Sequence, residues 1–144
     1  MSEVPDGVEM GVASRKIRPS ATLMITRDGN DGVEILLGRR ADSMPAFPGY
    51  WAFPGGGLSR VDKLAVEDLE QLTGPNAAAI AAIMREVVEE LGFACVNGKL
   101  VEVNSTARDL VVEDKANWLG QVKQGNIPCD TTGIRHISSR TTPP

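Results

Sequence analysis

The alternation of apolar and polar residues predicts short strands in the first third of the chain. Apolar runs at 21–26 and 33–39 flank an Asp-Gly turn sequence at 27–32, a combination typical of a β-hairpin. The two prolines of 44–49 deny regular ladder hydrogen bonds, so this segment is predicted to be an ordered loop. A short aromatic strand is expected over 50–53, before a glycine-rich sharp turn.

Helical spacing replaces this alternation in the middle of the chain. Leucines at helical intervals predict a helix over 61–72, which Gly74 and Pro75 end. A second helix is predicted to begin after Asn76, an N-cap residue, and to end at Gly92, which suits the left-handed position that follows a helix. The pattern therefore predicts two consecutive helices after the strands.

Weaker patterns mark the two ends of the chain. Residues 1–18 lack a period and suit a tail or an extra first strand. A strand is predicted over 99–103, an amphipathic helix over 111–122, and a final short strand over 134–137. We expect Trp51 and Trp118 to lie in the core. For Phe47 and Tyr50, buried packing is favoured over stacking on a nucleobase.

One face of the second helix is acidic. The apolar stripe consists of Ile80, Ile83, Met84, Val87, Val88 and Leu91. Glu86, Glu89 and Glu90 share an arc of about 100° on the far side, and Arg85 borders them. Like charges this close weaken a helix unless a cation neutralises them, and hard oxygen ligands suit Mg²⁺ or Mn²⁺. An ordinary solvated face is the alternative, and the restrictive neighbouring sequence favours the metal site.

Composition excludes several other classes of protein. The chain has 144 residues, enough for one domain, and a net charge of −4, which disfavours a polymeric nucleic acid as partner. It contains no apolar stretch long enough for a membrane span and no leader pattern, so a cytoplasmic location is expected. Cys95 and Cys129 lack metal-ligand spacing, and the single histidine, His136, is expected to be structural.

The run from Arg85 to Phe93, together with the preceding Phe-Pro-Gly-Gly turn, resembles the Nudix box. The resemblance implies an α/β fold, an α/β/α sandwich with a mixed sheet over residues 19–144, with the box at 55–93. It also implies a Mg²⁺- or Mn²⁺-dependent enzyme that cleaves a diphosphate bond. The implied metal ligands and catalytic residues are Glu86, Glu89 and Glu90, with Arg85 orienting the carboxylates and the Gly55 and Gly56 backbone beside the metal and phosphates.

The first half of the box departs from the family pattern. Its usual glutamate is expected at position 62, where the chain has Asp62, and fifteen additional residues separate this position from Arg85. The insertion spans about 62–77. Asp62 is therefore a candidate metal ligand with a shorter side chain than the family's glutamate.

Residues 36–56 are similar to the Nudix branch that contains coenzyme A and acyl-CoA diphosphatases. This resemblance implies a small-molecule substrate in which a nucleoside diphosphate is linked to another group, such as CoA. Arg39 and Arg40 would then bind phosphates, since a guanidinium fork matches phosphate geometry. Capping of a surface strand is the alternative role for these arginines.

Members of that branch usually continue past a Thr-Pro like Thr142-Pro143, so the domain is expected to be incomplete at its C-terminus. An incomplete sheet exposes an edge and an apolar face, which favours a homodimer. These departures leave a rival function, a catalytically weak or inactive nucleotide-binding or regulatory module. A purely structural protein is the third interpretation, and it predicts that no divalent ion binds.

Overall fold

The computed structural model describes residues 19–45 and 47–135 of the chain. In chain order the elements are β1 (Ser20–Thr22), β2 (Thr26–Gly29), β3 (Gly32–Ile35), β4 (Gly38–Arg39), β5 (Trp51–Ala52), β6 (Gly55–Gly57), α1 (Arg60–Asp68), α2 (Ala77–Leu91), β7 (Phe93–Val96), β8 (Lys99–Glu102), α3 (Ser105–Glu113) and α4 (Asn117–Lys123). The predicted tail at 1–18 and the end of the strand predicted at 134–137 lie outside the described residues.

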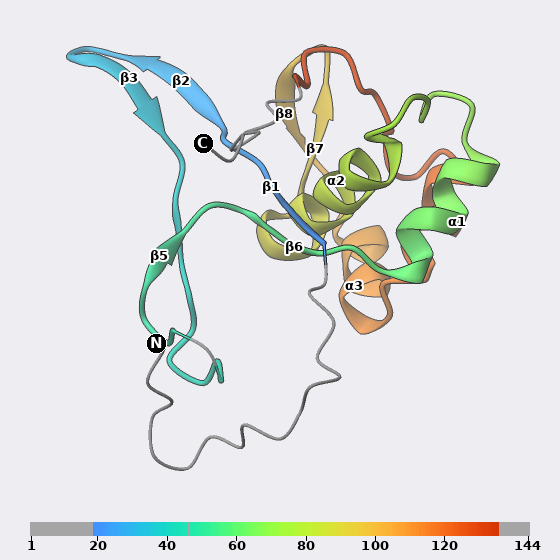
Figure 1. Ribbon diagram of the computed structural model, residues 1–144, viewed down its shortest axis with the longest axis horizontal. Helices are drawn as coiled ribbons and strands as arrows, with labels where there is room; N and C mark the ends of the chain where they lie inside the picture. The colour runs from blue at the N-terminus through green and yellow to red at the C-terminus, as the bar shows by residue number, and fades with distance from the viewer. Residues whose placement is uncertain (1–18, 46, 136–144) are drawn as a thin grey trace, which may run out of the picture.

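Helix α2 is the central element of the fold (Figure 1). The alanine-rich sequence at its start favours a helix, and Gly92 ends it in the left-handed conformation at φ 74°. The β1/β6 ladder packs on one side of α2, and helices α1 and α3 pack on another. The acidic residues of α2 therefore belong to the helix with the most packing partners.

Two apolar clusters hold α2 in place. On the side of the β1/β6 ladder, Ile83 and Val87 pack with Ala21. On the helical side, the cluster contains Ala65, Leu69, Leu72, Ala77, Ala81, Met84, Val88, Val111, Trp118 and Ile127, with further small residues around them. Trp118 of α4 is completely buried, as predicted. Because two faces of α2 are buried, its carboxylates lie on the narrow part of the helix surface that remains.

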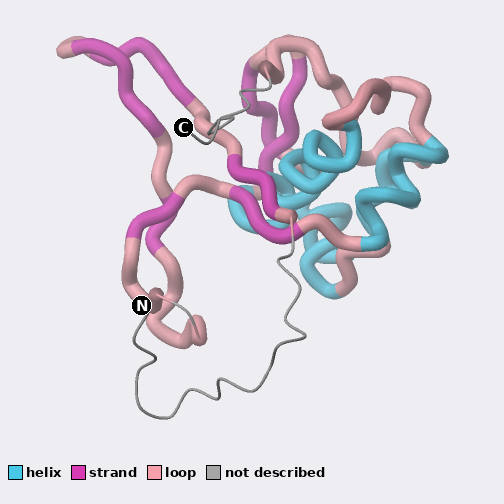
Figure 2. The backbone as a smooth tube through the Cα atoms, in the orientation of Figure 1, coloured by secondary structure: helices cyan, strands magenta, loops and turns pink. Residues whose placement is uncertain are grey.

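A second region, residues 23–45 and 47–53, extends away from α2, and we call it the arm (Figure 2). Its strands pair only with one another, β2 with β3 and β4 with β5. Ten of the twelve exposed large apolar side chains among the described residues lie in it. They are Met24, Val33, Ile35, Leu36, Leu37, Met44, Phe47, Tyr50, Trp51 and Phe53. The arm thus exposes apolar side chains, while the incomplete sheet and the homodimer stay predictions.

The α/β fold is confirmed, and the strand pairing differs from a single mixed sheet. The described strands form four two-stranded ladders, all of them antiparallel. The segment expected as a sharp glycine turn is instead strand β6, in which Gly56 pairs with Ala21. A Cβ at Gly55 would overlap the carbonyl oxygen of Ala21, so only glycine allows the two strands to approach this closely.

Several strands and helices begin or end at residues other than those predicted. The hairpin is present, but its turn is the pair Asn30-Asp31, and β2 contains residues expected in the turn. The helix predicted over 111–122 is two helices, α3 and α4, and strand β7 was not predicted. None of the helices in the described ranges is both long and apolar enough to cross a membrane.

The aromatic residues of the arm correct a further expectation. Trp51 is 64% exposed rather than part of the core, and Phe47 and Tyr50 are also exposed. Phe47 and Tyr50 contact each other edge to face, with ring centroids 5.7 Å apart. Buried packing is therefore the wrong interpretation for these three side chains.

Candidate functional site

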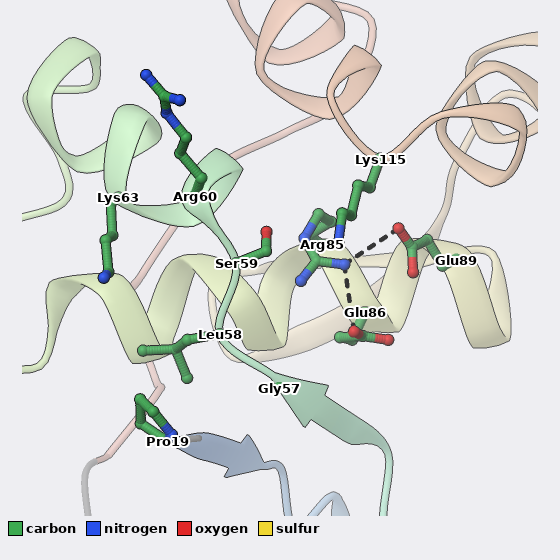
Figure 3. Close-up of a pocket in the computed structure, with 10 residues that line it drawn as sticks. All are labelled: Pro19, Gly57, Leu58, Ser59, Arg60, Lys63, Arg85, Glu86, Glu89 and Lys115. Atoms are coloured by element: carbon green, nitrogen blue, oxygen red, sulfur yellow. Dashed lines mark hydrogen bonds and ion pairs between the residues drawn. The ribbon is translucent and has the colours of Figure 1, made fainter. Parts of the chain in front are cut away.

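Arg85 is the hub of the acidic cluster on α2. Its guanidinium donates from Nε to Asp62 Oδ1 at 2.8 Å and from Nη2 to Asp62 Oδ2 at 3.1 Å. The remaining nitrogen, Nη1, donates to Glu86 Oε1 at 3.2 Å and to Glu89 Oε1 at 3.1 Å (Figure 3). Arg85 thus contacts the carboxylates of Asp62, Glu86 and Glu89 from a position that is only 2% exposed.

Asp62 has a different place from the one predicted. Its side chain is completely buried, and its oxygens accept hydrogen bonds from Arg85, the Ser59 backbone N–H at 2.8 Å and the Ser59 hydroxyl at 3.3 Å. The bond to the Ser59 N–H also caps the start of α1. Asp62 is therefore the partner of Arg85 rather than a metal ligand, and its shorter side chain suffices for a bidentate ion pair.

The carboxylates around Arg85 shift its pKa. Burial by itself lowers the pKa of Arg85, but the hydrogen bond and charge of Asp62, with Glu89 and Glu86, raise that pKa above its ordinary value. Arg85 is therefore always a cation and neutralises Asp62 in the interior. The buried Arg85–Asp62 ion pair therefore lies in a fixed position beneath the surface carboxylates.

Glu86 and Glu90 form a second pair at the surface of α2. Their carboxyl groups lie within hydrogen-bonding reach of each other. Burial raises the pKa of both groups, and the Glu90 charge raises that of Glu86 further, against the opposing effect of Arg85. Such a pair resists carrying two negative charges unless a cation joins it.

The backbone of β6 lies directly against this pair. The Gly55 N–H donates to Glu90 Oε2 at 3.4 Å, and a Cβ at Gly56 would lie 2.6 Å from Glu86 Oε1. A side chain at position 56 would collide with Glu86 and one at position 55 with β1, so the two glycines let β6 approach both the carboxylates and β1. The structure thus brings together four of the predicted residues, Gly55, Gly56, Glu86 and Glu90.

Glu89 accepts a hydrogen bond from the same Arg85 nitrogen, Nη1, as Glu86 does. Its carboxylate is held by Arg85, and burial raises its pKa, with Lys115 acting in the opposite direction. Within residues 19–45 and 47–135, no three His, Cys, Asp or Glu side chains lie close enough together to hold a metal ion. The three glutamates therefore stay a predicted metal site, in which Glu86 and Glu90 lie against the β6 backbone.

Two hollows flank the carboxylates. The larger, of about 650 Å³, is lined by Pro19, Gly57, Leu58, Ser59, Arg60, Lys63, Arg85, Glu86, Glu89 and Lys115 (Figure 3). The smaller, of about 300 Å³, contains Arg39, Arg40, Gly55 and Glu90 in its lining. The Arg40 charge acts on Glu90, whereas Arg39 donates to the Gly49 carbonyl at 3.2 Å and to Asp42 at 3.4 Å. Both predicted phosphate-binding arginines therefore border the site.

Arg108 of α3 is a residue that the sequence pattern did not indicate. Its Nη2 donates to the Glu89 carbonyl at 3.1 Å and to the Glu90 carbonyl at 3.5 Å. Its side chain packs on Gly92, where a Cβ would lie 3.1 Å from Arg108 Cδ. A cation at this end of α2 satisfies free carbonyls and complements the helix dipole.

Arg108, Lys63 and Lys115 were all missed because each reaches the site from an element distant in sequence. Ser59 carries a signal that could have been recognised, since a serine three residues before an acid is typical of a helix start. The site is therefore wider than the acidic helix, with basic residues from three elements around it.

Comparisons with known proteins agree with this geometry. A family model described as the NUDIX domain matches residues 16–120. A solved structure, a NUDIX hydrolase from Alicyclobacillus acidocaldarius, is 26% identical and superposes with a TM-score of 0.70. The match covers 92% of this chain and 65% of that one, so the chain spans less than two thirds of the length of the solved protein. No curated protein matched the chain.

Proposed function

The chain belongs to the NUDIX family, and from this premise we propose that it is a Mg²⁺- or Mn²⁺-dependent hydrolase of a phosphoanhydride bond. Its substrate is a nucleoside diphosphate linked to another group, with CoA or an acyl-CoA as the first candidate. The observation that carries the proposal is the pair of carboxylates, Glu86 and Glu90, placed against the β6 backbone. Hydrolysis by water at phosphorus is the reaction that such a site suits.

The metal fits this pair for a chemical reason. Two carboxylates within hydrogen-bonding reach repel each other when both are ionised, and hard oxygen donors on a rigid helix are ligands that Mg²⁺ accepts. Glu86 and Glu90 would hold the ion, with the Gly55 backbone beside it. When bound, the ion lowers the pKa of water and offsets phosphate charge.

The side chains of the chain have separate parts in the reaction. Glu86 accepts the proton of the attacking water as the new oxygen–phosphorus bond forms. Arg85 holds Glu86 and Glu89 in position from below. The bridging oxygen leaves with the electron pair of the broken bond, and Arg40, close to Glu90, balances its charge.

The arginines of the arm support the choice of a diphosphate substrate. Arg39 and Arg40 line the smaller hollow together with Gly55 and Glu90, so a phosphate bound there lies beside the metal candidates. A guanidinium recognises phosphate through paired hydrogen bonds. Both arginines belong to the exposed arm. The position of the arm therefore affects the affinity for substrate more than the rate of the chemical step.

Incubation of the purified chain with CoA, NADH and ADP-ribose in the presence of MgCl₂, followed by chromatography of the nucleotide products, tests the proposal. We expect two phosphomonoester products from at least one of these substrates. Glu90→Gln should lower kcat by at least about 100-fold, since a group that acts on transition-state charge is lost. Binding of nucleotide with no product from any substrate would contradict the proposal and support the regulatory module instead.

Glu67→Gln is the matched control for this assay. Glu67 lies on α1, is exposed and is absent from both hollows. The same chemical change there should leave turnover within about twofold of the unmodified chain, because surface substitutions of this kind act weakly. Equal losses in the two variants would show that a general charge effect, rather than metal ligation, is responsible.

A further inference from the structure

The larger hollow contains basic residues that have no part in the hydrolysis of a simple diphosphate. Arg60, Lys63 and Lys115 line it opposite Glu86 and Glu89. Arg60 and Lys63 come from α1, with Lys63 inside the insertion that interrupts the acidic motif, and Lys115 comes from the segment between α3 and α4. The insertion therefore adds positive charge to the edge of the site.

The lining of the larger hollow carries charges of both signs. It contains four cationic side chains, those of Arg60, Lys63, Arg85 and Lys115, and the carboxylates of Glu86 and Glu89. Arg85 is paired with Asp62, Glu86 and Glu89, and Arg60 points away from the carboxylates. Lys63 and Lys115 are therefore the two cations of the lining that can meet a further anion in the hollow.

The two lysines are placed to meet an anion. Figure 3 shows Lys63 extending from α1 toward α2 and Lys115 reaching toward Arg85, whereas the Arg60 guanidinium points away from the carboxylates. Among the described residues, the Lys63 side chain makes no hydrogen bond or ion pair, and the Lys115 side chain acts on Glu89 only through its charge. Both ammonium groups are therefore available to a ligand in the hollow.

We propose that this hollow binds an additional phosphomonoester of the substrate, separate from the scissile diphosphate, with Lys63 and Lys115 as its recognition residues. The inference rests on the proposed function for the position of the diphosphate, between Glu90 and Arg40 on the other side of the carboxylates. A phosphomonoester carries a charge of about −1.5 to −2 at pH 7, which matches the two ammonium groups of Lys63 and Lys115. The volume of about 650 Å³ is sufficient for part of a nucleotide.

Pairs of ligands that differ by one phosphate test this directly. Calorimetric titration without metal compares adenosine 5′-monophosphate with the 3′,5′-bisphosphate and the 2′,5′-bisphosphate. We expect at least one bisphosphate to bind about tenfold more tightly than the monophosphate. We expect Lys63→Gln to abolish most of this preference, and Lys115→Gln to reduce it, with little change for the monophosphate.

Lys99→Gln is the control, because Lys99 is an exposed residue of β8 outside both hollows. Absence of a preference in the unmodified chain overturns the inference. It is also overturned if Lys63→Gln behaves like the control, or if that variant weakens both ligands equally. Because the titration needs no turnover, failure to hydrolyse any substrate would remove the proposed function while leaving this binding result intact.

Discussion

The region around α2 and the arm contain the same kinds of residues in opposite environments. Trp118 is completely buried beneath α2, while Trp51 of the arm is 64% exposed. The Arg85–Asp62 pair is inside the protein, whereas the Arg27–Glu34 pair, at 3.3 Å, joins two exposed side chains of the β2/β3 hairpin. The difference teaches that the type of a residue alone does not determine its role. Side chains that burial holds in place are suited to catalysis, and exposed side chains are suited to substrate recognition.

The tryptophans give the largest expected contrast. Trp118→Ala should lower the free energy of unfolding by about 3–5 kcal/mol, because it removes a completely buried aromatic side chain and leaves a cavity. Trp51→Ala should change it by about 0.5 kcal/mol or less, since the side chain is mostly in solvent. Urea unfolding followed by circular dichroism measures both values. Similar losses in the two variants would mean that the arm packs on the rest of the molecule in solution.

The ion pairs provide a second contrast. Arg85→Gln should destabilise the fold by about 3 kcal/mol, because Asp62 would remain as a buried carboxylate without its cation. Arg27→Gln should cost at most about 1 kcal/mol, because its pair with Glu34 is exposed and screened. The same urea experiment, repeated at high salt, distinguishes the two variants. Salt should reduce the small effect of Arg27→Gln and leave that of Arg85→Gln nearly unchanged.

Arg108→Met should destabilise the fold less than Trp118→Ala or Arg85→Gln, yet its effect should reach the site. Arg108→Met should cost about 1–2 kcal/mol, through loss of charged hydrogen bonds to the Glu89 and Glu90 carbonyls. It should also weaken Mn²⁺ binding, because the end of α2 that carries Glu90 loses its anchor. Arg39→Met in the arm is the comparison. It should leave Mn²⁺ binding unchanged and raise KM for a diphosphate substrate, and weaker Mn²⁺ binding in this variant would contradict the division of roles.

The sequence predicted the region around α2 better than the arm. Helix α2 has both an apolar stripe and end signals at Asn76 and Gly92, so its bounds were recognised to within a residue. The arm has equally apolar residues, but periodicity reports only which positions can be buried. Whether another element covers them depends on tertiary contacts, and for this reason Trp51 was expected in the core.

The candidate site was predictable in part for a similar reason. Glu86 and Glu90 lie four residues apart on one helix, so their proximity follows from helical geometry. Glu89 is expected to join them, and its carboxylate shares Arg85 Nη1 with that of Glu86, a contact that a helical wheel does not contain. The place of Asp62 depends on how α1 packs on α2 across the insertion, which spacing in the sequence does not determine.

Mn²⁺ titration followed by electron paramagnetic resonance tests the central claim most directly, because it counts bound ions without requiring a substrate. The account predicts that the unmodified chain and Glu67→Gln bind Mn²⁺ with equal affinity. It predicts that Glu86→Gln and Glu90→Gln each bind at least about tenfold more weakly, because each removes one charged oxygen ligand. Equal Mn²⁺ affinity in all four proteins would contradict it.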